Sequence, residues 1–224
     1  MAVAACLFAP AHGQGADDVS NTDDSLRIYA VKTVKTRLFQ RETGFGIYLG
    51  SGAVITASHV IGHWPLNVDR RVIVAGQELP ANVVKQGSLE ETDLAILTVD
   101  DKRLPVNLRL RRNPVCRGPL RVGTEVVVVN SKGTARSRIT SPMTIPAEYR
   151  SKYGTIISDV ELAGSGSGVF DANRRCLLGI ISRKISMSVV RLPGQRAGIA
   201  PAEFAKYFVP APTIAEFLPA EFRF

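Results

Sequence analysis

The stretch "ELAGSGSGVFDANRRCLLGII", residues 161–181, places a run of glycine and serine between two apolar segments. A run of this composition is usually a flexible linker, but here an apolar, strand-like segment follows it directly. Glycine also permits the backbone conformations of tight turns that other residues resist. We therefore interpret residues 164–168 as a tight turn that presents either Ser165 or Ser167 at the start of a strand.

Short β-branched segments separated by turn residues continue outward from this stretch in both directions. They cover residues 26–33, 45–57, 70–76, 93–100, 124–130, 154–162, 168–171, 176–182 and 187–192. This spacing is typical of an all-β sandwich or barrel. Helical periodicity is scarce. The main candidate is residues 212–219, where Thr213 is placed to cap a short helix between two prolines.

The proline- and arginine-rich residues 103–119 divide these segments into two groups of similar size, which predicts a linker between two packed barrels. A length of 224 residues suits one large all-β unit or two small domains, and an apolar fraction of 45% is sufficient for a core. The chain is basic, with 28 Lys and Arg against 20 Asp and Glu, and seven of these basic residues lie between Lys102 and Arg121. Such a cluster can bind nucleic acid or anionic lipid. The prolines and the lack of a nucleic-acid motif favour a solvated connecting segment instead.

The N-terminal residues 1–16 combine an apolar stretch of small residues with small-x-small cleavage sites, as a secretory signal peptide does. No Lys or Arg precedes Arg27, so either the chain start is truncated or the segment is not a signal. We favour a clipped signal peptide, and no other stretch approaches the roughly 18 apolar residues of a membrane span. If Cys6 leaves with the signal, Cys116 and Cys176 remain as either a disulfide or two unrelated buried thiols.

Three polar residues stand at the ends of strand-like segments in the order histidine, aspartate, serine. His59 follows the strand-like residues 54–57, Asp93 opens residues 93–100, and the serine lies in the glycine turn. A serine hydroxyl needs a base within hydrogen-bond reach to act as a nucleophile, and an imidazole serves as that base. A carboxylate holds the imidazole in the required tautomer, and glycines around the serine let backbone N–H groups converge on an oxyanion. The pattern therefore indicates nucleophilic catalysis by a serine.

Three motifs carry a resemblance to a known family. "TASHV" at residues 56–60 resembles the motif T-A-A-H, and "TDLAILTV" at residues 92–99 resembles D-L-A-[LV]-L. Residues 159–182 resemble the serine motif D-V-x-P-G-[DN]-S-G and the strand that follows it. Over residues 26–218 the chain thus resembles the chymotrypsin-like serine proteases, in particular the short bacterial trypsin-like and HtrA-type catalytic domains.

The resemblance implies an all-β fold of two six-stranded antiparallel β-barrels with a short C-terminal helix. Residues 17–110 would form the first barrel with His59 and Asp93, and residues 111–224 the second barrel with the serine. It further implies a secreted or periplasmic serine endopeptidase that hydrolyses a polypeptide substrate through an acyl-enzyme. No metal, cofactor, nucleic acid or stable membrane insertion is implied.

The serine motif departs from the family pattern around its nucleophile. Our preferred alignment makes Ser165 the nucleophile and places the N–H groups of Ala163 and Ser165 at the oxyanion hole, whereas the rival register makes Ser167 the nucleophile. Ala163 replaces the usual glycine, and its Cβ would cost about 1 kcal/mol or more if the position needs a positive φ. This departure motivates an alternative function, a catalytically impaired protease-fold protein that binds a peptide or protein partner.

Further residues fall where the resemblance places substrate binding. Asp159 lies where trypsins carry the pocket aspartate that selects Arg or Lys, and Ser182 matches the serine that supports the triad carboxylate. Arg183 and Lys184 follow where the substrate-pairing edge and the pocket wall should lie. Two cations there would oppose a cationic substrate side chain or neutralise Asp159, so electrostatics leaves the substrate class open.

Overall fold

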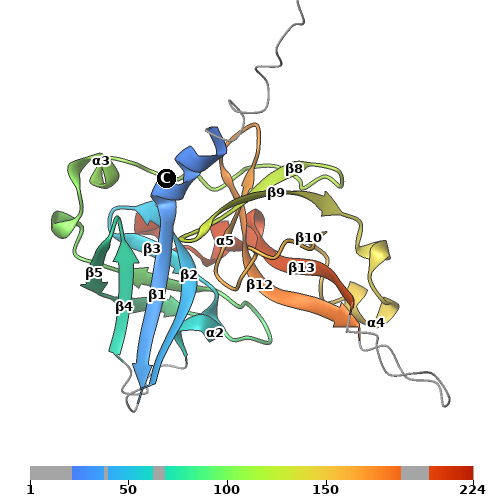
Figure 1. The fold of residues 1–224 in the computed structure, drawn as a ribbon, viewed down its shortest axis with the longest axis horizontal. Helices are drawn as coiled ribbons and strands as arrows, with labels where there is room; N and C mark the ends of the chain where they lie inside the picture. The colour runs from blue at the N-terminus through green and yellow to red at the C-terminus, as the bar shows by residue number, and fades with distance from the viewer. Residues whose placement is uncertain (1–21, 38–39, 63–68, 188–201, 224) are drawn as a thin grey trace, which may run out of the picture.

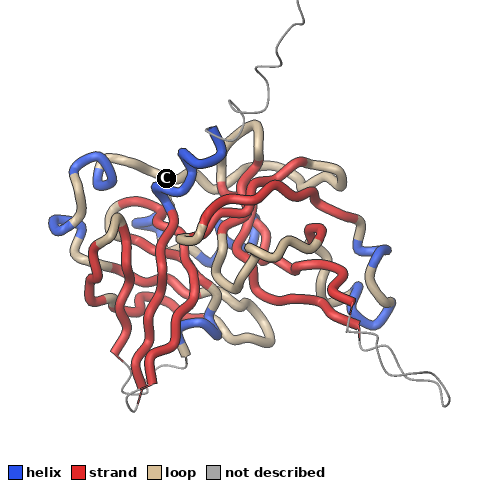
Figure 2. The backbone as a smooth tube through the Cα atoms, in the orientation of Figure 1, coloured by secondary structure: helices blue, strands red, loops and turns tan. Residues whose placement is uncertain are grey.

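The computed structural model describes residues 22–37, 40–62, 69–187 and 202–223, and the expected signal peptide at residues 1–16 lies outside them. The described chain forms two β units that pack side by side, and strands dominate both (Figure 1, Figure 2). This arrangement confirms the predicted all-β fold of two packed units.

The first unit is a seven-stranded antiparallel sheet in the order β5-β4-β1-β2-β3-β7-β6. Its strands are β1 (Ala30–Arg37), β2 (Gln40–Gly50), β3 (Ala53–Thr56), β4 (Asp69–Val74), β5 (Gln77–Pro80), β6 (Asn82–Gln86) and β7 (Ala95–Thr98). Alternate residues of a strand face opposite sides of the sheet. Val31 on β1 is accordingly buried in the core of this unit, whereas its neighbour Lys32 is half-exposed on the other face.

The strand count of the first unit corrects the predicted six, because one segment of chain is divided between the two edges of the sheet. Only Ala81 separates β5, which pairs with β4, from β6, which pairs with β7. Ala81 is buried at the bend, and its N–H donates to the Arg70 carbonyl at 2.9 Å. Counted as one bent strand, β5 and β6 connect both edges of the sheet, which makes the first unit a half-barrel of six strands.

The second unit is a closed six-stranded barrel in the order β10-β13-β12-β11-β8-β9. Its strands are β8 (Glu125–Asn130), β9 (Gly133–Thr140), β10 (Ile156–Ser158), β11 (Gly168–Asp171), β12 (Leu177–Met187) and β13 (Ala202–Pro210). The barrel closes where β9 pairs with β10, through Ile139 opposite Ile157. Both of these side chains belong to the apolar cluster that fills the barrel.

The helical segments are short. They are η1 (Ser25–Tyr29), α2 (Ser58–Ile61), η2 (Asp101–Arg103), α3 (Val106–Arg109), η3 (Pro142–Thr144), α4 (Ala147–Arg150), α5 (Ala211–Phe217) and η4 (Ala220–Phe222). The expected C-terminal helix is α5, but Thr213 does not cap it. β13 runs up to Pro210, whose fixed φ leads straight into the helix, so Thr213 lies inside the first turn. None of the helices in the described ranges is long and apolar enough to cross a membrane.

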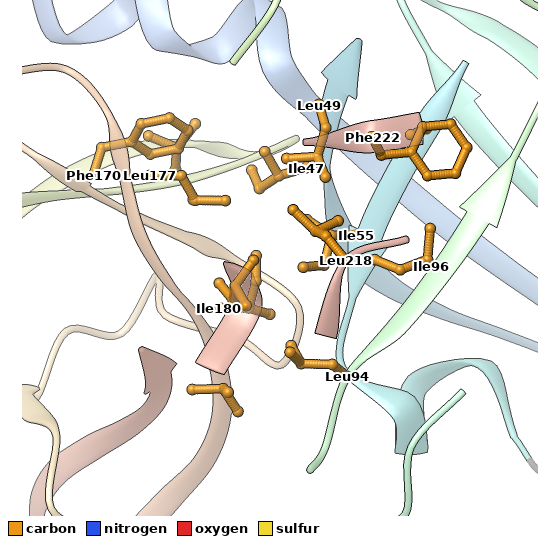
Figure 3. Close-up of a cluster of buried hydrophobic side chains, with 14 of the residues drawn as sticks. Ile47, Leu49, Ile55, Leu94, Ile96, Phe170, Leu177, Ile180, Leu218 and Phe222 are labelled. Atoms are coloured by element: carbon orange, nitrogen blue, oxygen red, sulfur yellow. The ribbon is translucent and has the colours of Figure 1, made fainter. Parts of the chain in front are cut away.

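A third apolar core lies between the two units (Figure 3). Figure 3 shows Ile47, Leu49, Ile55, Leu94 and Ile96 of the first sheet facing Phe170, Leu177 and Ile180 of the second, with Leu218 and Phe222 from the C-terminal end. The residues before β1 also reach across, since Asp23 accepts a 2.7 Å hydrogen bond from Arg136 on β9. Both ends of the described chain therefore help to fix the two units against each other.

Candidate active site

The pairing of two neighbouring strands brings His59 and Asp93 together. β3 pairs with β7, and Thr56 at the end of β3 lies opposite Ala95 at the start of β7. His59 follows β3 on α2 and Asp93 precedes β7, so both lie at the same end of this strand pair. The His59 Nδ1 atom lies 2.8 Å from Asp93 Oδ2, and the His59 backbone N–H donates to Asp93 Oδ1 at 3.1 Å.

The Asp93 carboxylate is buried, with 4% of its surface exposed, and it accepts three hydrogen bonds. The third donor is the Ser182 hydroxyl, 2.5 Å from Oδ2. Burial disfavours the ionised carboxylate, but the bonds from the His59 ring, the Ser182 hydroxyl and the His59 N–H outweigh it and hold the pKa of Asp93 below its usual value. An ionised Asp93 keeps the proton of His59 on Nδ1, so the other ring nitrogen, Nε2, is left as a base.

The glycine and serine run is a tight turn between β10 and β11, as the sequence predicts. Gly166 has a φ of +86°, and a Cβ placed there would lie 2.0 Å from the Phe45 carbonyl oxygen. Only glycine fits this position. The Gly166 N–H donates to the Ile181 carbonyl at 2.8 Å, which fixes the turn against β12.

The two candidate serines of this turn have different surroundings. Ser167 is completely buried, and its hydroxyl accepts a 3.0 Å hydrogen bond from the Asn130 side chain. Ser165 is only partly buried, and its hydroxyl donates to the Ser182 carbonyl at 3.1 Å. Ser165 is therefore the serine of this turn that is linked, through Ser182, to the His59–Asp93 pair.

Ser182 connects the parts of this site through two different atoms. Its hydroxyl donates to Asp93 and its carbonyl accepts from Ser165. It lies at a bulge where the pairing of β12 with β13 shifts register between Ile181 and Arg183, which leaves its backbone out of the ladder. In the described part of the chain, the Ser165 hydroxyl is hydrogen-bonded to the Ser182 carbonyl and not to the His59 ring.

The backbone N–H groups just before Ser165 form hydrogen bonds within their own loop. The Ala163 N–H donates to the Val160 carbonyl at 2.9 Å, and the Gly164 N–H donates to the Leu162 carbonyl at 2.8 Å. Ala163 avoids the positive φ that would strain its Cβ, since the only described non-glycine residues with positive φ are elsewhere in the chain. The N–H group expected to serve the oxyanion hole is thus turned into the loop in this conformation.

A partly buried ion pair lies next to this loop. Asp159 follows β10, and its carboxylate is 3.2 Å from the ammonium of Lys206 on β13. The side chain of Lys206 is 8% exposed and that of Asp159 is 27% exposed. The cation that neutralises Asp159 is therefore Lys206, which sequence analysis missed. A lysine within the apolar run "FAKYFV" was the available signal.

Arg183 and Lys184 do not form the ion pair with Asp159 that was considered for them. Arg183 spans the two units instead, because its guanidinium donates to the Leu89 carbonyl at 2.6 Å and to the Tyr153 hydroxyl at 3.3 Å. Lys184 is exposed on β12 opposite Lys206. Strand alternation explains the difference, since Arg183 and Lys184 face opposite sides of β12.

The residues that could support metal or redox chemistry are few. The described residues contain no group of three or more His, Cys, Asp and Glu side chains placed to hold a metal ion.

Cys116 and Cys176 form a disulfide with an S–S distance of 1.97 Å and a Cα–Cα distance of 5.0 Å. This bridge ties the segment before β8 to the turn before β12.

Comparisons with known proteins agree with this architecture. A family model described as the trypsin-like peptidase domain matches residues 44–180. No curated protein matches the chain. Among solved structures, the active form of the Rv3671c protease from M. tuberculosis is 20% identical with a TM-score of 0.60, over 97% of this chain and 92% of that chain. Deg5 is 15% identical with a TM-score of 0.63, over 92% and 95% of the two chains. The HtrA-type protease AlgW with a tripeptide is 19% identical with a TM-score of 0.58, over 88% of this chain and 61% of that one.

Proposed function

The chain belongs to the trypsin-like peptidase family, and from this premise we propose that His59, Asp93 and Ser165 form the catalytic triad of an exported serine endopeptidase. The family assignment confirms the resemblance inferred from the three motifs and makes the chain a serine protease. The observation that carries the proposal is the hydrogen-bonded path from Asp93 to His59 on one side and through Ser182 to Ser165 on the other.

In the proposed mechanism, His59 Nε2 takes the proton of the Ser165 hydroxyl while the serine oxygen attacks the carbonyl carbon of the substrate peptide bond. The tetrahedral intermediate collapses to an acyl-enzyme when His59 gives this proton to the departing amine. A water molecule then attacks the acyl carbon, with His59 again as the base, and releases the acid product and free Ser165. Asp93 stabilises the imidazolium that forms in each half-reaction.

Two local movements precede this chemistry. The Ser165 hydroxyl leaves the Ser182 carbonyl and turns to His59 by a change of its χ1 rotamer. The loop from Val160 to Ala163 opens, so that the N–H groups of Ala163 and Ser165 point at the developing oxyanion. The developing oxyanion favours the opening of the loop, because it is a stronger acceptor for the Ala163 N–H than the Val160 carbonyl is.

Two observations support a location of the mature protein in an oxidising, extracytoplasmic compartment. Residues 1–16 combine an apolar stretch of small residues with small-x-small cleavage sites, as a secretory signal does, although no Lys or Arg precedes Arg27. Cys116 and Cys176 are joined in a disulfide, which persists in the periplasm or outside the cell. We therefore propose that the mature protein is periplasmic or secreted.

A fluorophosphonate probe tests the nucleophile. The probe should label the wild-type protein and the Ser167→Ala variant, while Ser165→Ala should abolish labelling with no loss of the folded state. Mass-spectrometric mapping should place the label on Ser165. Labelling that survives in Ser165→Ala and disappears in a folded Ser167→Ala variant would reverse the assignment.

The hydrogen bonds that engage the Ala163 N–H and the Ser165 hydroxyl favour a second function. The protein would then be a catalytically impaired protease that binds a peptide or a protein partner. The Ala163 N–H and the Ser165 hydroxyl are both engaged inside the protein. On this alternative, the folded wild-type protein takes up no probe but still binds peptides. The labelling experiment therefore separates the two functions.

A further inference from the structure

A groove with a volume of about 690 Å³ opens beside the turn that carries Ser165. Its floor is the outer face of three neighbouring strands of the first sheet, where Ile73 of β4, Lys32 of β1 and Phe45 of β2 form one cross-strand row. Its walls come from η1, with Arg27, and from the turn between β8 and β9, with Lys132. Because η1 contacts strands of both units, the groove lies at their junction (Figure 1).

Phe45 connects this groove to the reactive serine. Its backbone N–H donates to the Ser165 carbonyl at 3.3 Å. Its ring lies so close to Gly164 that a Cβ on that glycine would be 2.6 Å from a ring carbon. Ser165 is thus hydrogen-bonded both to Ser182 of β12 and to Phe45 of β2. Phe45 thus lines the groove and contacts the Ser165 turn, so we infer that substrate residues beyond Ser165 on this side can reach the groove.

The groove carries an excess of positive charge. Among the described residues, three cations line it, Arg27, Lys32 and Lys132, against the single carboxylate of Asp24. Asp24 is already 3.7 Å from Arg27 and also accepts a hydrogen bond from Thr134.

The two lysines of the groove remain available to a ligand. Within the described ranges, no carboxylate lies within ion-pair distance of Lys32 or Lys132. The Lys132 ammonium lies 5.8 Å from the centre of the Phe45 ring, which holds this cation over the entrance from Ser165.

We propose that this groove binds the leaving-group side of the polypeptide substrate and selects segments rich in Asp and Glu. The proposal rests on the proposed function, in which the acyl side of the substrate lies along β12. Carboxylates two to four residues beyond the scissile bond would meet Lys132 first and then Lys32 and Arg27. The net charge of +8 over the whole chain adds long-range attraction for such segments.

Paired substrates test the selection. Two fluorescence-quenched peptides share their acyl side and carry either Glu or Gln at the second to fourth positions of the leaving-group side. The wild type should cleave the Glu peptide with a kcat/KM about tenfold higher at low salt, because several exposed ion pairs add their small contributions. High salt should reduce this ratio.

Charge reversal in the groove provides the decisive comparison. The double variant Lys32→Glu/Lys132→Glu should bring the Glu-to-Gln ratio to one or below. A coumarin amide with the same acyl side has no residues for the groove, and its hydrolysis should be unchanged. The matched control Lys102→Glu/Arg103→Glu changes the same charge on exposed η2, away from the groove, and should keep the wild-type ratio. A wild-type ratio of one, or the same ratio in both double variants, would overturn the proposal.

A binding measurement separates failure of this inference from failure of the proposed function. In the Ser165→Ala background, fluorescence anisotropy should show tighter binding of the Glu peptide than of the Gln peptide, and Lys32→Glu/Lys132→Glu should abolish the difference. A wild type that takes up no fluorophosphonate and cleaves no peptide would refute the proposed function, and the anisotropy would still decide on the groove. Equal affinity for the two peptides would refute the acidic selection even in an active enzyme.

Discussion

Ser182 shows how much of the site depends on a single side chain and its backbone. One of its oxygens binds Asp93 and the other binds Ser165, so the carboxylate and the serine share a positioning residue. Asp93 in turn accepts hydrogen bonds from both the His59 ring and the His59 backbone N–H. At this scale the geometry is set by hydrogen bonds in a buried environment, where an unpaired polar group is costly.

Replacing Asp93 with Asn tests the proposed role of the carboxylate. The amide should lower kcat by about 10⁴-fold, because it favours the wrong imidazole tautomer and cannot stabilise the imidazolium, as in the Ser-His-Asp template. The measurement is turnover of a peptide ester by a variant with an unchanged circular dichroism spectrum. Near-normal turnover in Asp93→Asn would exclude Asp93 as the triad acid.

The depressed pKa of Asp93 also predicts how stability depends on pH. Its unfolded value is about 3.9, and its folded value is lower, so the ionised carboxylate favours the folded state. This contribution is fully present above the unfolded pKa and is lost as the pH falls through the folded pKa. Urea unfolding between pH 5 and pH 2 should therefore show a steeper loss of stability for the wild type than for Asp93→Asn. Parallel curves for the two proteins would contradict the assignment.

The Asp159–Lys206 pair predicts a change in the residue preferred on the acyl side of the scissile bond. Lys206→Met removes the cation and leaves the Asp159 carboxylate, which is partly exposed and lies six residues before Ser165 in the chain. Cleavage after Arg or Lys should rise by about tenfold or more, as one new charged hydrogen bond would give. A peptide library read by mass spectrometry measures the profile. Lys206→Met/Asp159→Asn is the control and should not show the gain; an unchanged profile in Lys206→Met would rule out a role for Asp159 in selection.

At the scale of elements, β12 organises the second unit around the site. It pairs with both β11 and β13, and its bulge presents Ser182. The chain before β8 is attached to its start, since Val115 forms a parallel bridge with Leu177 and Cys116 donates its N–H to the Leu177 carbonyl. The disulfide therefore reinforces an attachment that the backbone already makes.

Removal of the disulfide should destabilise the protein. The bridge joins residues that are 60 positions apart, and a loop of that length implies a loss of about 4 kcal/mol in the free energy of unfolding from chain entropy. Urea unfolding of Cys116→Ala/Cys176→Ala against the wild type measures this loss. If the wild type treated with reductant and iodoacetamide unfolds at the same urea concentration as the oxidised protein, the bridge contributes no stability.

At the scale of the whole molecule, the two β units act as one because the largest apolar core lies between them (Figure 3). The site depends on this interface, since the first unit contributes His59 and Asp93 while the second contributes Ser165 and Ser182. A shift of one unit against the other would break the Ser182–Asp93 bond. Stability of the interface and geometry of the site are therefore linked.

Phe170 is the residue through which we expect this linkage to be measurable. It is fully buried between the units, and its ring stacks on Tyr29 at a centroid distance of 6.3 Å. Phe170→Ala should lower the free energy of unfolding by about 3–5 kcal/mol, and unfolding should remain a single transition by fluorescence and circular dichroism. Two separate transitions in the wild type would show that the units unfold independently.

The sequence by itself determined the all-β class, the two groups of strands and the three motif residues. These features are local: alternation and turn residues mark the strands around Asp93 and Ser165, and the glycines mark the turn. The family resemblance follows from the same short motifs. It also raised the choice between Ser165 and Ser167, because both serines have glycine neighbours.

Only the tertiary structure decided which distant groups meet. It buried Ser167 against Asn130, paired Asp159 with Lys206, turned the Ala163 N–H into its own loop and bent one strand at Ala81 to serve both edges of a sheet. The contacts of Ser167 with Asn130 and of Asp159 with Lys206 do not follow from local pattern, because each depends on the register of strands that are far apart in the chain. Register is chosen by the packing of whole apolar faces, and a one-residue shift of a strand would send side chains such as those of Asn130 and Lys206 to the opposite face.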